Sequence, residues 1–291
     1  MNEINKLISG FFEPPIRDYI DKIPSGKQLR SRLICAIAKE SDKRFLLSAI
    51  VETIHLASLL HDDIIDDAKT RRGAPAVFVT DGAKKAIMIG DIFYATAFSK
   101  LSAFDSAIAQ IISEAVAKLS YGEFLDAELS KSFNTDRKKY ENMIYLKTSA
   151  LIEASCEAAA ILAGKDRDRF RRFGALLGVA FQTIDDLLDI TQDTATLGKP
   201  ALNDLSEGKV TLPLIDYYHT ADENEKAKAL SFFKKKLKTN DAKRLRAALY
   251  KSGAIDKSRQ YAAALLNEAK GLVENDEELL AAAESLISRI K

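Results

Sequence analysis

Residues 54–75 read IHLASLLHDDIIDDAKTRRGAP and hold an acidic cluster inside an apolar, helix-patterned run. The cluster has the form Asp-Asp-x-x-Asp and consists of Asp62, Asp63 and Asp66. On a helix its first and last carboxylates lie one turn apart on one face, where their repulsion weakens the helix slightly. Clustered carboxylates usually keep their charge beside a cation. Mg²⁺ in particular takes oxygen ligands from one or two carboxylates together with substrate phosphates.

The same spacing of apolar residues at three and four recurs along most of the 291-residue chain. It predicts helices over 29–38, 47–65, 83–103, 105–129, 137–163 and 167–190, followed by shorter, more charged helices over about 222–238, 241–251, 254–271 and 275–290. No segment alternates for long between apolar and polar residues, so we expect no sheet. Gly and Pro fall mostly where helices should stop. We therefore expect an all-α fold, a large single-domain bundle over residues 1–291 with long central helices.

A second acidic cluster of the same form lies in residues 178–213, GVAFQTIDDLLDITQDTATLGKPALNDLSEGKVTLP. Its members are Asp185, Asp186 and Asp189. Both clusters lie near the C-terminal end of a predicted helix, so the two helices could face each other across one cavity. Basic residues follow each cluster, and guanidinium or ammonium groups at such positions bind phosphate oxygens. They are Arg71, Arg72, Lys199 and Lys209.

Two further elements carry cations that phosphate chemistry could use. Gly26, Lys27 and Arg30 open a predicted helix, and a helix N-terminus attracts anions. Lys147 interrupts a small-residue helix face beside Thr148. Taken singly, each element has a plainer interpretation: surface salt bridges, ordinary helix-surface charge, or a lysine that extends its amine to solvent. The repetition of the acidic-then-basic design at two places favours a shared function.

Bulk composition sets limits on the remaining classes of function. The net charge of +1 supplies no overall field for nucleic acid or an anionic membrane. The lysine-rich run at 234–238 is interpreted most simply as a solvated helix face. Cys35 and Cys156 lie in apolar stretches, as buried reduced thiols do. The N-terminus lacks a signal-peptide pattern, and no uninterrupted apolar run approaches the roughly 20 residues that span a bilayer. These features predict a cytoplasmic protein.

Taken together, these residues resemble the trans-isoprenyl diphosphate synthase, or polyprenyl synthetase, family over about residues 26–213. The family's GGKRLRP motif corresponds to SGKQLRS at 25–31, and its aspartate-rich motifs to HDDIIDDAKTRRG at 61–73 and FQTIDDLLD at 181–189. Its GD, KT and closing elements correspond to Gly90-Asp91, Lys147-Thr148 and DLSEGKVTLP at 204–213. A single DDxxD is a weak signal, whereas this ordered set is highly specific. Ser25, Gln28 and Ser31 depart from the family's Gly, Arg and Pro.

The resemblance implies a helical bundle around a deep cavity and a Mg²⁺-dependent prenyl transfer. The implied metal ligands are Asp62, Asp63, Asp66, Asp185, Asp186 and Asp189, and the implied direct contacts to an allylic diphosphate are Arg71, Lys147, Lys199 and Lys209. Isopentenyl diphosphate would be bound by Lys27, Arg30, His55 and Arg72. Departure of the allylic diphosphate would leave a carbocation, sheltered by Thr148 and Gln182. The isopentenyl double bond would attack it, and the released diphosphate would accept the proton.

Product length depends on the residues below the first motif. Ala57 and Ser58 lie about one turn below the carboxylates on the same helix, and both are small. Short-chain enzymes of the family often carry aromatic residues there, or insert two residues in the first motif. The resemblance therefore implies a product longer than farnesyl, of octaprenyl type. Geranylgeranyl or farnesyl diphosphate synthesis is the alternative, because a bulky residue such as Tyr121 or Phe124 could form a tunnel floor.

Other classes of protein share parts of this pattern. His61-Asp62 could belong to an HD-type metal phosphohydrolase, but such a site needs several His ligands and the chain has three His in all. A non-catalytic subunit of a two-component prenyl synthase would be expected to lose aspartates. A terpene cyclase would more often carry a different second motif. As partners we expect the two diphosphate substrates, a second copy of the chain bound through residues 83–129, and a transient membrane-surface contact during product release, with no nucleic acid.

Overall fold

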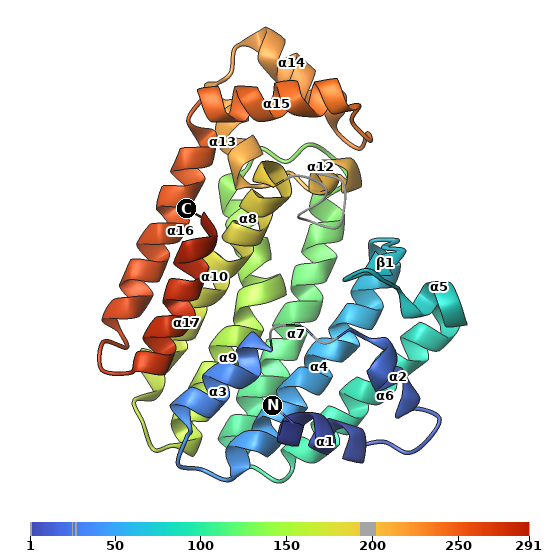
Figure 1. Ribbon diagram of the computed structural model, residues 1–291, viewed down its shortest axis with the longest axis vertical. Helices are drawn as coiled ribbons and strands as arrows, with labels where there is room; N and C mark the ends of the chain where they lie inside the picture. The colour runs from blue at the N-terminus through green and yellow to red at the C-terminus, as the bar shows by residue number, and fades with distance from the viewer. Residues whose placement is uncertain (1, 25, 27, 193–201, 291) are drawn as a thin grey trace. The chain divides into compact units, whose positions relative to one another are not determined.

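The computed structural model describes residues 2–24, 26, 28–192 and 202–290 (Figure 1). Helices make up nearly all of its regular structure, which confirms the predicted all-α class. The residues group into two compact units. The first comprises residues 1–117 and 151–174, and the second comprises residues 118–150 and 175–291. That the whole chain forms a single domain stays a prediction.

The first unit is built around one long helix. Its elements are α1 (Asn2–Gly10), α2 (Asp18–Lys22), α3 (Leu29–Ile37), α4 (Lys43–Ile65), β1 (Thr70–Arg71), β2 (Ala74–Pro75), α5 (Val77–Asp81), α6 (Ala83–Leu101) and parts of α7 (Ser106–Leu129), α9 (Ala150–Leu162) and α10 (Arg167–Thr191). Helices α1, α3 and α6 all pack against α4 (Figure 1). Ile4, Ala57, Leu60 and Phe93 belong to one buried cluster there. Among the described residues, the expectation of no sheet is wrong at β1 and β2, an antiparallel pair of two-residue strands directly after the first aspartate motif.

Helix α4 is long and apolar enough to cross a membrane by length and composition. Yet 67% of its apolar window is buried inside the protein, and it carries the polar residues Glu52 and His55. Both features are those of a core helix, and burial explains its apolar sequence.

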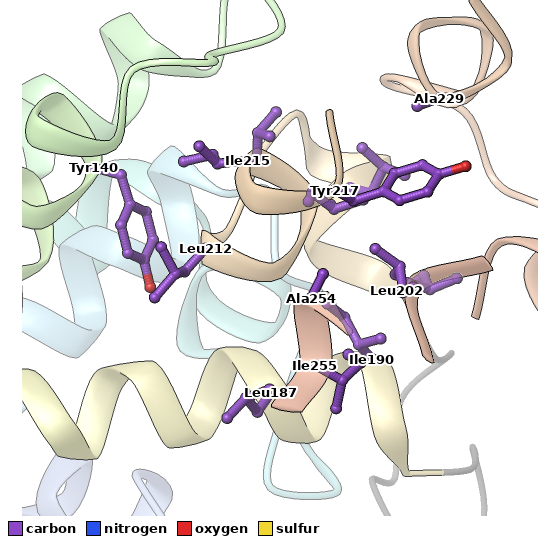
Figure 2. Packing of buried hydrophobic residues seen from close by; sticks show 14 of the residues in the cluster. Tyr140, Leu187, Ile190, Leu202, Leu212, Ile215, Tyr217, Ala229, Ala254 and Ile255 are labelled. Carbon is purple, nitrogen blue, oxygen red and sulfur yellow. The ribbon is translucent and has the colours of Figure 1, made fainter. Parts of the chain in front are cut away.

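The second unit contains the rest of the chain. Its remaining elements are α8 (Arg137–Ile144), the π-helical turn η1 (Tyr145–Ser149), α12 (Asn203–Glu207), α13 (Leu212–Thr220), α14 (Glu223–Phe232), α15 (Thr239–Lys251), α16 (Ala254–Gly271), α17 (Glu277–Ile287) and the 3₁₀ turn η2 (Ser288–Ile290). Figure 2 shows its core, in which Leu187 and Ile190 of α10 lie in one buried cluster with Leu212 and Ile255. Since this apolar face of α10 is packed in the core, the orientation of the aspartates on the same turns of the helix is set as well.

The helix boundaries follow local sequence signals. Asp136, Asp222 and Asp276 accept backbone hydrogen bonds at the starts of α8, α14 and α17, as N-caps do. Two predicted helices differ from the structure. The helix predicted over 137–163 is interrupted by η1, and the one predicted over 222–238 ends at Phe232, so the lysine-rich run lies between α14 and α15.

Candidate active site

The first aspartate motif ends α4 and is held by the arginine that follows it. Asp63 is buried, and its Oδ1 accepts a hydrogen bond from Arg71 Nε at 2.7 Å and forms an ion pair with Nη2 at 2.6 Å. Asp62 and Asp66 are half-buried, and Asp66 caps α4 with its N–H bonded to Asp62 O at 2.8 Å. The short β1–β2 hairpin returns the chain and places Arg71 beside the carboxylates. The ion pair considered from the sequence therefore exists, but its acidic partner is buried and not on the surface.

Several predicted isopentenyl-site cations come together in the first unit. Arg72 Nη1 donates to Pro24 O at 2.5 Å, and its guanidinium covers Gly26, where a Cβ would lie 2.5 Å from Nη2. A side chain at position 26 would displace the Arg72 guanidinium from this place. Burial, with the charges of Arg30, Arg72 and Arg71, holds the pKa of His55 well below its ordinary value. His55 is therefore neutral near pH 7 and can donate or accept a hydrogen bond, while the arginines supply the positive charge.

A buried carboxylate lies close to these cations. Glu52 is 5% exposed, and its negative charge acts on both Arg30 and Arg72. Ser31, which replaces the proline of the family motif, donates to Glu52 Oε1 from its hydroxyl at 2.8 Å and from its N–H at 3.4 Å. Proline could make neither bond, so this departure from the family pattern fixes the Glu52 carboxylate.

His61 faces α6 and not a metal site. Its Nε2 lies 3.3 Å from Ile87 O and 3.5 Å from Asp91 Oδ1. A Cβ on Gly90 would lie 2.4 Å from the same nitrogen. The Gly-Asp element is thus explained by packing, because glycine admits the imidazole and the next residue pairs with it.

In the second unit, a cavity of about 110 Å³ brings together four of the predicted residues. Its polar lining combines carboxylates with two amines, and its floor is apolar. The polar residues include Asp126, Tyr140, Lys147, Gln182, Asp186, Asp204 and Lys209. Lys147, Gln182, Asp186 and Lys209 were predicted from the sequence, and the structure brings them together.

Asp186 is the centre of a buried hydrogen-bond chain. Tyr140 Oη donates to its Oδ2 at 2.6 Å, and Gln182 Nε2 donates to its Oδ1 at 2.8 Å. Thr148 Oγ1 in turn donates to Gln182 Oε1 at 2.7 Å. Burial, together with the charge of Asp204, raises the pKa of Asp186 to about 8, although both hydrogen bonds oppose the shift. The predicted cation-sheltering residue Gln182 is therefore bonded directly to a predicted metal ligand, and Thr148 is linked to that ligand through Gln182.

Lys147 is held by carboxylates from α7. Its Nζ lies 2.8 Å from Glu123 Oε2 and 2.7 Å from Asp126 Oδ2, and Lys209 Nζ lies 3.9 Å from the same Asp126 oxygen. Only 19% of the Lys147 side chain is exposed. These contacts contradict the plainer interpretation that Lys147 extends its amine to solvent.

The π-helical turn η1 explains how Lys147 reaches this position. A Cβ at Gly122 would lie 2.2 Å from Lys147 N, and one at Gly178 would lie 2.5 Å from Ser149 Oγ. Glycines on α7 and α10 thus let the backbone of η1 approach both helices closely. A π-turn inserts an extra residue and redirects the side chains around it, which is why such turns often mark functional sites.

The other two aspartates of the second motif have separate partners. Arg289 of η2 donates from Nη2 to Asp185 Oδ1 at 2.6 Å and lies over the Phe181 ring, 5.6 Å from its centroid. Asp189 is buried, and its Oδ2 accepts the N–H of Asp204 at 3.2 Å. The third aspartate therefore also organises the segment that leads to Lys209.

Some predicted residues lie elsewhere. Lys27 and Lys199 fall outside the described residues. Ala57 is fully buried in the core cluster of the first unit, and Ser58 Oγ donates to His55 O at 2.9 Å. The sequence reasoning missed several residues that contact predicted ones. They are Glu52, Glu123, Asp126, Tyr140, Asp204 and Arg289. Glu52 of α4 and the two acids of α7 left a signal in the sequence, as charges in otherwise apolar helices.

Both motifs offer a donor set suited to a hard divalent cation. Within the part of the chain that the structure describes, no three His, Cys, Asp or Glu side chains converge as a ready-made metal cage. Mg²⁺ does not require one, since it is usually bound through one or two carboxylates, waters and substrate phosphates. The aspartate oxygens therefore fit such an ion, and the diphosphate would complete its shell.

Comparison with known proteins assigns the family. The polyprenyl synthetase family model matches residues 13–250. The chain belongs to the polyprenyl synthetase family. It is 38% identical, over 246 residues, to an all-trans-nonaprenyl-diphosphate synthase (geranyl-diphosphate specific) of Rhodobacter capsulatus, which covers 79% of this chain and 73% of the relative.

Solved structures of the family have the same fold. The octaprenyl pyrophosphate synthase of Helicobacter pylori superposes with a TM-score of 0.93 at 37% identity, covering 98% of this chain and 97% of that one. A polyprenyl synthase of Caulobacter crescentus CB15, complexed with calcium and isoprenyl diphosphate, has a TM-score of 0.88 at 31% identity, covering 99% and 92%.

The family assignment fixes the class of reaction. The chain is an enzyme, a trans-prenyl diphosphate synthase, and thus a transferase of isoprenoid biosynthesis that acts on prenyl diphosphates. The HD-type phosphohydrolase considered from His61-Asp62 is wrong, as the packing of His61 against α6 also indicates.

Proposed function

We propose that this polyprenyl synthetase condenses isopentenyl diphosphate with an allylic diphosphate such as farnesyl diphosphate, in a Mg²⁺-dependent reaction that gives a long all-trans product of octaprenyl type. The observation that carries the proposal is that cations lie close to both aspartate motifs. Arg71 pairs with Asp63 of the first motif, and Lys147 and Lys209, which pair with Asp126 of α7, line the same cavity as Asp186 of the second motif. Such sites suit a polyanion, because the diphosphate can take over the cations while metal ions occupy the carboxylates.

The metal-binding roles are part of this proposal. Asp62, Asp63 and Asp66, with Asp185, Asp186 and Asp189, would hold Mg²⁺, and the calcium bound with isoprenyl diphosphate in the Caulobacter relative supports a divalent cation at such motifs. When bound, Mg²⁺ supplies Lewis-acid stabilisation of the departing diphosphate. Arg71, Lys147 and Lys209 neutralise its remaining charge, and Lys199 joins them.

The isopentenyl substrate is assigned to the cations of the first unit. Arg30 and Arg72, with Lys27, bind its diphosphate, and neutral His55 accepts or donates one hydrogen bond. Arg30 Nε is buried without a hydrogen-bond partner among the described residues, so an anion that accepts this donor would remove a desolvation penalty. Thr148 and Gln182 orient their oxygens around the allylic carbocation.

The long product is supported by the relatives, which are named octaprenyl and nonaprenyl synthases, and by the small residues below the first motif. The test is incubation with farnesyl diphosphate, labelled isopentenyl diphosphate and Mg²⁺, followed by chain-length analysis. We expect a product near octaprenyl. A product that stops at geranylgeranyl would reject the long-chain assignment, and no Mg²⁺-dependent product would reject catalysis and favour a non-catalytic subunit.

Substitution below the motif tests the proposed tunnel. Ala57→Phe or Ser58→Phe should shorten the product, because an aromatic ring one turn below the carboxylates would block the growing tail. Ala57 is fully buried, so its replacement will also cost about 1–3 kcal/mol of stability through overpacking. Ala86→Phe, which adds the same ring to the same core cluster from α6, is the matched control. An unchanged chain length in folded Ala57→Phe and Ser58→Phe enzymes would place the tunnel elsewhere.

The remaining parts of the proposal concern partners and place. We propose a homodimer, because α6 carries exposed apolar residues at helical spacing, with Met88 61% and Ile92 36% exposed. Tyr121 and Phe124 of α7 are also exposed and stacked on each other. Analytical ultracentrifugation would test the homodimer.

We also propose a cytoplasmic location, which the two free thiols support. A transient membrane contact during release of a long prenyl product completes the proposal.

A further inference from the structure

Positive charge in this chain is concentrated in one surface segment of the second unit. Residues 228–251, here called the basic segment, contain nine basic residues and one acidic residue, a net charge of +8. The whole chain has a net charge of +1, so the remainder is at −7. The segment comprises the end of α14, the connection after it and α15. Both helices pack against α13 (Figure 1).

The charges of the basic segment point to solvent. Its core-facing side chains are Ala229, Leu245 and Leu249, which are buried. The exposed basic residues are Lys228, Lys234, Lys235, Lys236, Lys238, Lys243, Arg244 and Lys251. No ion pair within the described residues involves Lys235, Lys236 or Lys238. A cluster of like charges without internal compensation disfavours the folded chain by itself and attracts a polyanionic surface.

Apolar side chains accompany these charges. Leu230 on α14 is 44% exposed and Tyr250 on α15 is 41% exposed. Lys243, Arg244, Ala247, Tyr250 and Lys251 recur at helical spacing, so they form one exposed face of α15. Basic helix faces that also carry aromatic or aliphatic residues lie well at the headgroup level of a bilayer, where the charges contact anionic lipids and the apolar groups enter the interface.

The basic segment is also bonded to the candidate active site. Lys234 N donates to Leu205 O at 3.1 Å, and the Lys234 side chain covers Gly208, directly before Lys209. Arg246 Nη2 donates to Gln192 O at 3.0 Å, three residues after Asp189. A partner bound to this surface therefore contacts the element that supports the second aspartate motif and the cavity amines.

We propose that the basic segment docks the enzyme on membranes containing anionic lipid. The inference deepens the membrane contact proposed above and rests on the proposed long-chain product, whose hydrocarbon is insoluble in water. The basic segment would also attract nucleic acid. Nucleic-acid binding would not need the exposed Leu230 and Tyr250, however, and the proposed reaction makes a lipid.

The test is flotation of the full chain with vesicles of phosphatidylglycerol and phosphatidylcholine, compared with phosphatidylcholine alone. The wild type should float with the anionic vesicles and be released by high salt. Replacing Lys235, Lys236 and Lys238 together by Gln should weaken partitioning by about a hundredfold, since each lysine near the surface contributes roughly fivefold. The matched control replaces the exposed Lys138, Lys139 and Lys257 by Gln, which removes the same charge elsewhere in the second unit.

The control variant should float like the wild type. Equal losses in the two triple variants, equal flotation with neutral vesicles, or retention on duplex nucleic acid without flotation would each overturn the proposal. Product length and turnover of all three proteins are measured in parallel with farnesyl diphosphate. The variant with Gln at Lys235, Lys236 and Lys238 should keep the wild-type product length and turnover. If the wild type floats as predicted but makes a short product, the proposed long-chain function is rejected while the docking surface is not.

Discussion

The two aspartate motifs have the same spacing but different support. In the first, Asp63 is bound by Arg71, which lies eight residues later on the adjoining hairpin. In the second, Asp186 is bound by Tyr140, 46 residues earlier, and Asp185 by Arg289, 104 residues later. The first motif is thus organised by its own neighbours in sequence, whereas the second is organised by the tertiary fold. Both arrangements hold carboxylates in place before metal and diphosphate bind.

Removing the first aspartate of either motif should have the largest effect. Asp62→Ala and Asp185→Ala should each lower Mg²⁺-dependent condensation by about a thousandfold, because each removes a ligand that stabilises the departing diphosphate. Steady-state incorporation of labelled isopentenyl diphosphate measures this, with circular dichroism as the folding control. Near wild-type turnover in either variant would show that its motif does not bind the catalytic metal.

The cations beside the motifs should matter next. Arg71→Gln and Lys147→Gln should each lower turnover by about a hundredfold through lost diphosphate contacts. The two variants should differ in stability. Arg71→Gln removes the cation beside one carboxylate, Asp63, whereas Lys147→Gln removes the cation nearest to two, Glu123 and Asp126, at a cost of about 3–5 kcal/mol. Urea unfolding of the two variants makes the comparison. Equal stability would mean that the fold does not depend on the Lys147 pairs.

The second motif should also show a pH signature in the absence of metal. The raised pKa of Asp186, about 8, means that the folded state holds a proton that the unfolded state releases near pH 4. This stabilisation is present at low pH and is lost as pH rises towards 8. Relative to wild type, Asp186→Asn should therefore gain stability as pH rises from 5 to 9, by a few kcal/mol at most. Thermal unfolding in EDTA tests this, and a constant difference across that range would contradict it.

The smallest expected effect concerns Arg289. Its guanidinium pairs with the Asp185 carboxylate and must move away before a metal ion binds there. Arg289→Gln should therefore tighten metal binding severalfold, an effect of the size expected for one Coulombic contact at a partly exposed site. Mn²⁺ titration followed by electron paramagnetic resonance measures this without turnover. Arg259→Gln, which removes an exposed ion pair with Asp256 on α16, is the matched control. Weaker Mn²⁺ binding in Arg289→Gln would show instead that the arginine orients Asp185 for the metal.

Much of the fold was predictable because helix signals are local. Periodicity placed α10 at 167–190 against the observed Arg167–Thr191, and α16 at its observed bounds of 254–271. The π-turn was not predictable, since the glycines that leave room for its backbone lie on other helices, far away in the sequence. Short elements such as α5 were also missed, because five residues are too few to show a period.

The candidate site divides in the same way. The charged residues proposed for the chemistry occur in an ordered set of motifs. Asp63, Arg71, Lys147 and Asp186 could therefore be predicted from the sequence. Their supports could not, because Tyr140 and Arg289 sit in segments that resemble ordinary helix sequence and acquire their roles only through tertiary contacts. The family assignment is shown by the comparisons, while the individual metal and substrate roles stay predictions.

The most direct test of the central claim is metal binding in the presence of an unreactive allylic analogue, farnesyl thiodiphosphate. Equilibrium dialysis with Mn²⁺ should show that the analogue and the metal bind together to the wild-type chain. Asp62→Ala and Asp185→Ala should each lose part of the bound metal and bind the analogue more weakly. Full metal content and unchanged analogue affinity in either variant would contradict the account, because the altered motif would then take no part in binding the metal and the diphosphate.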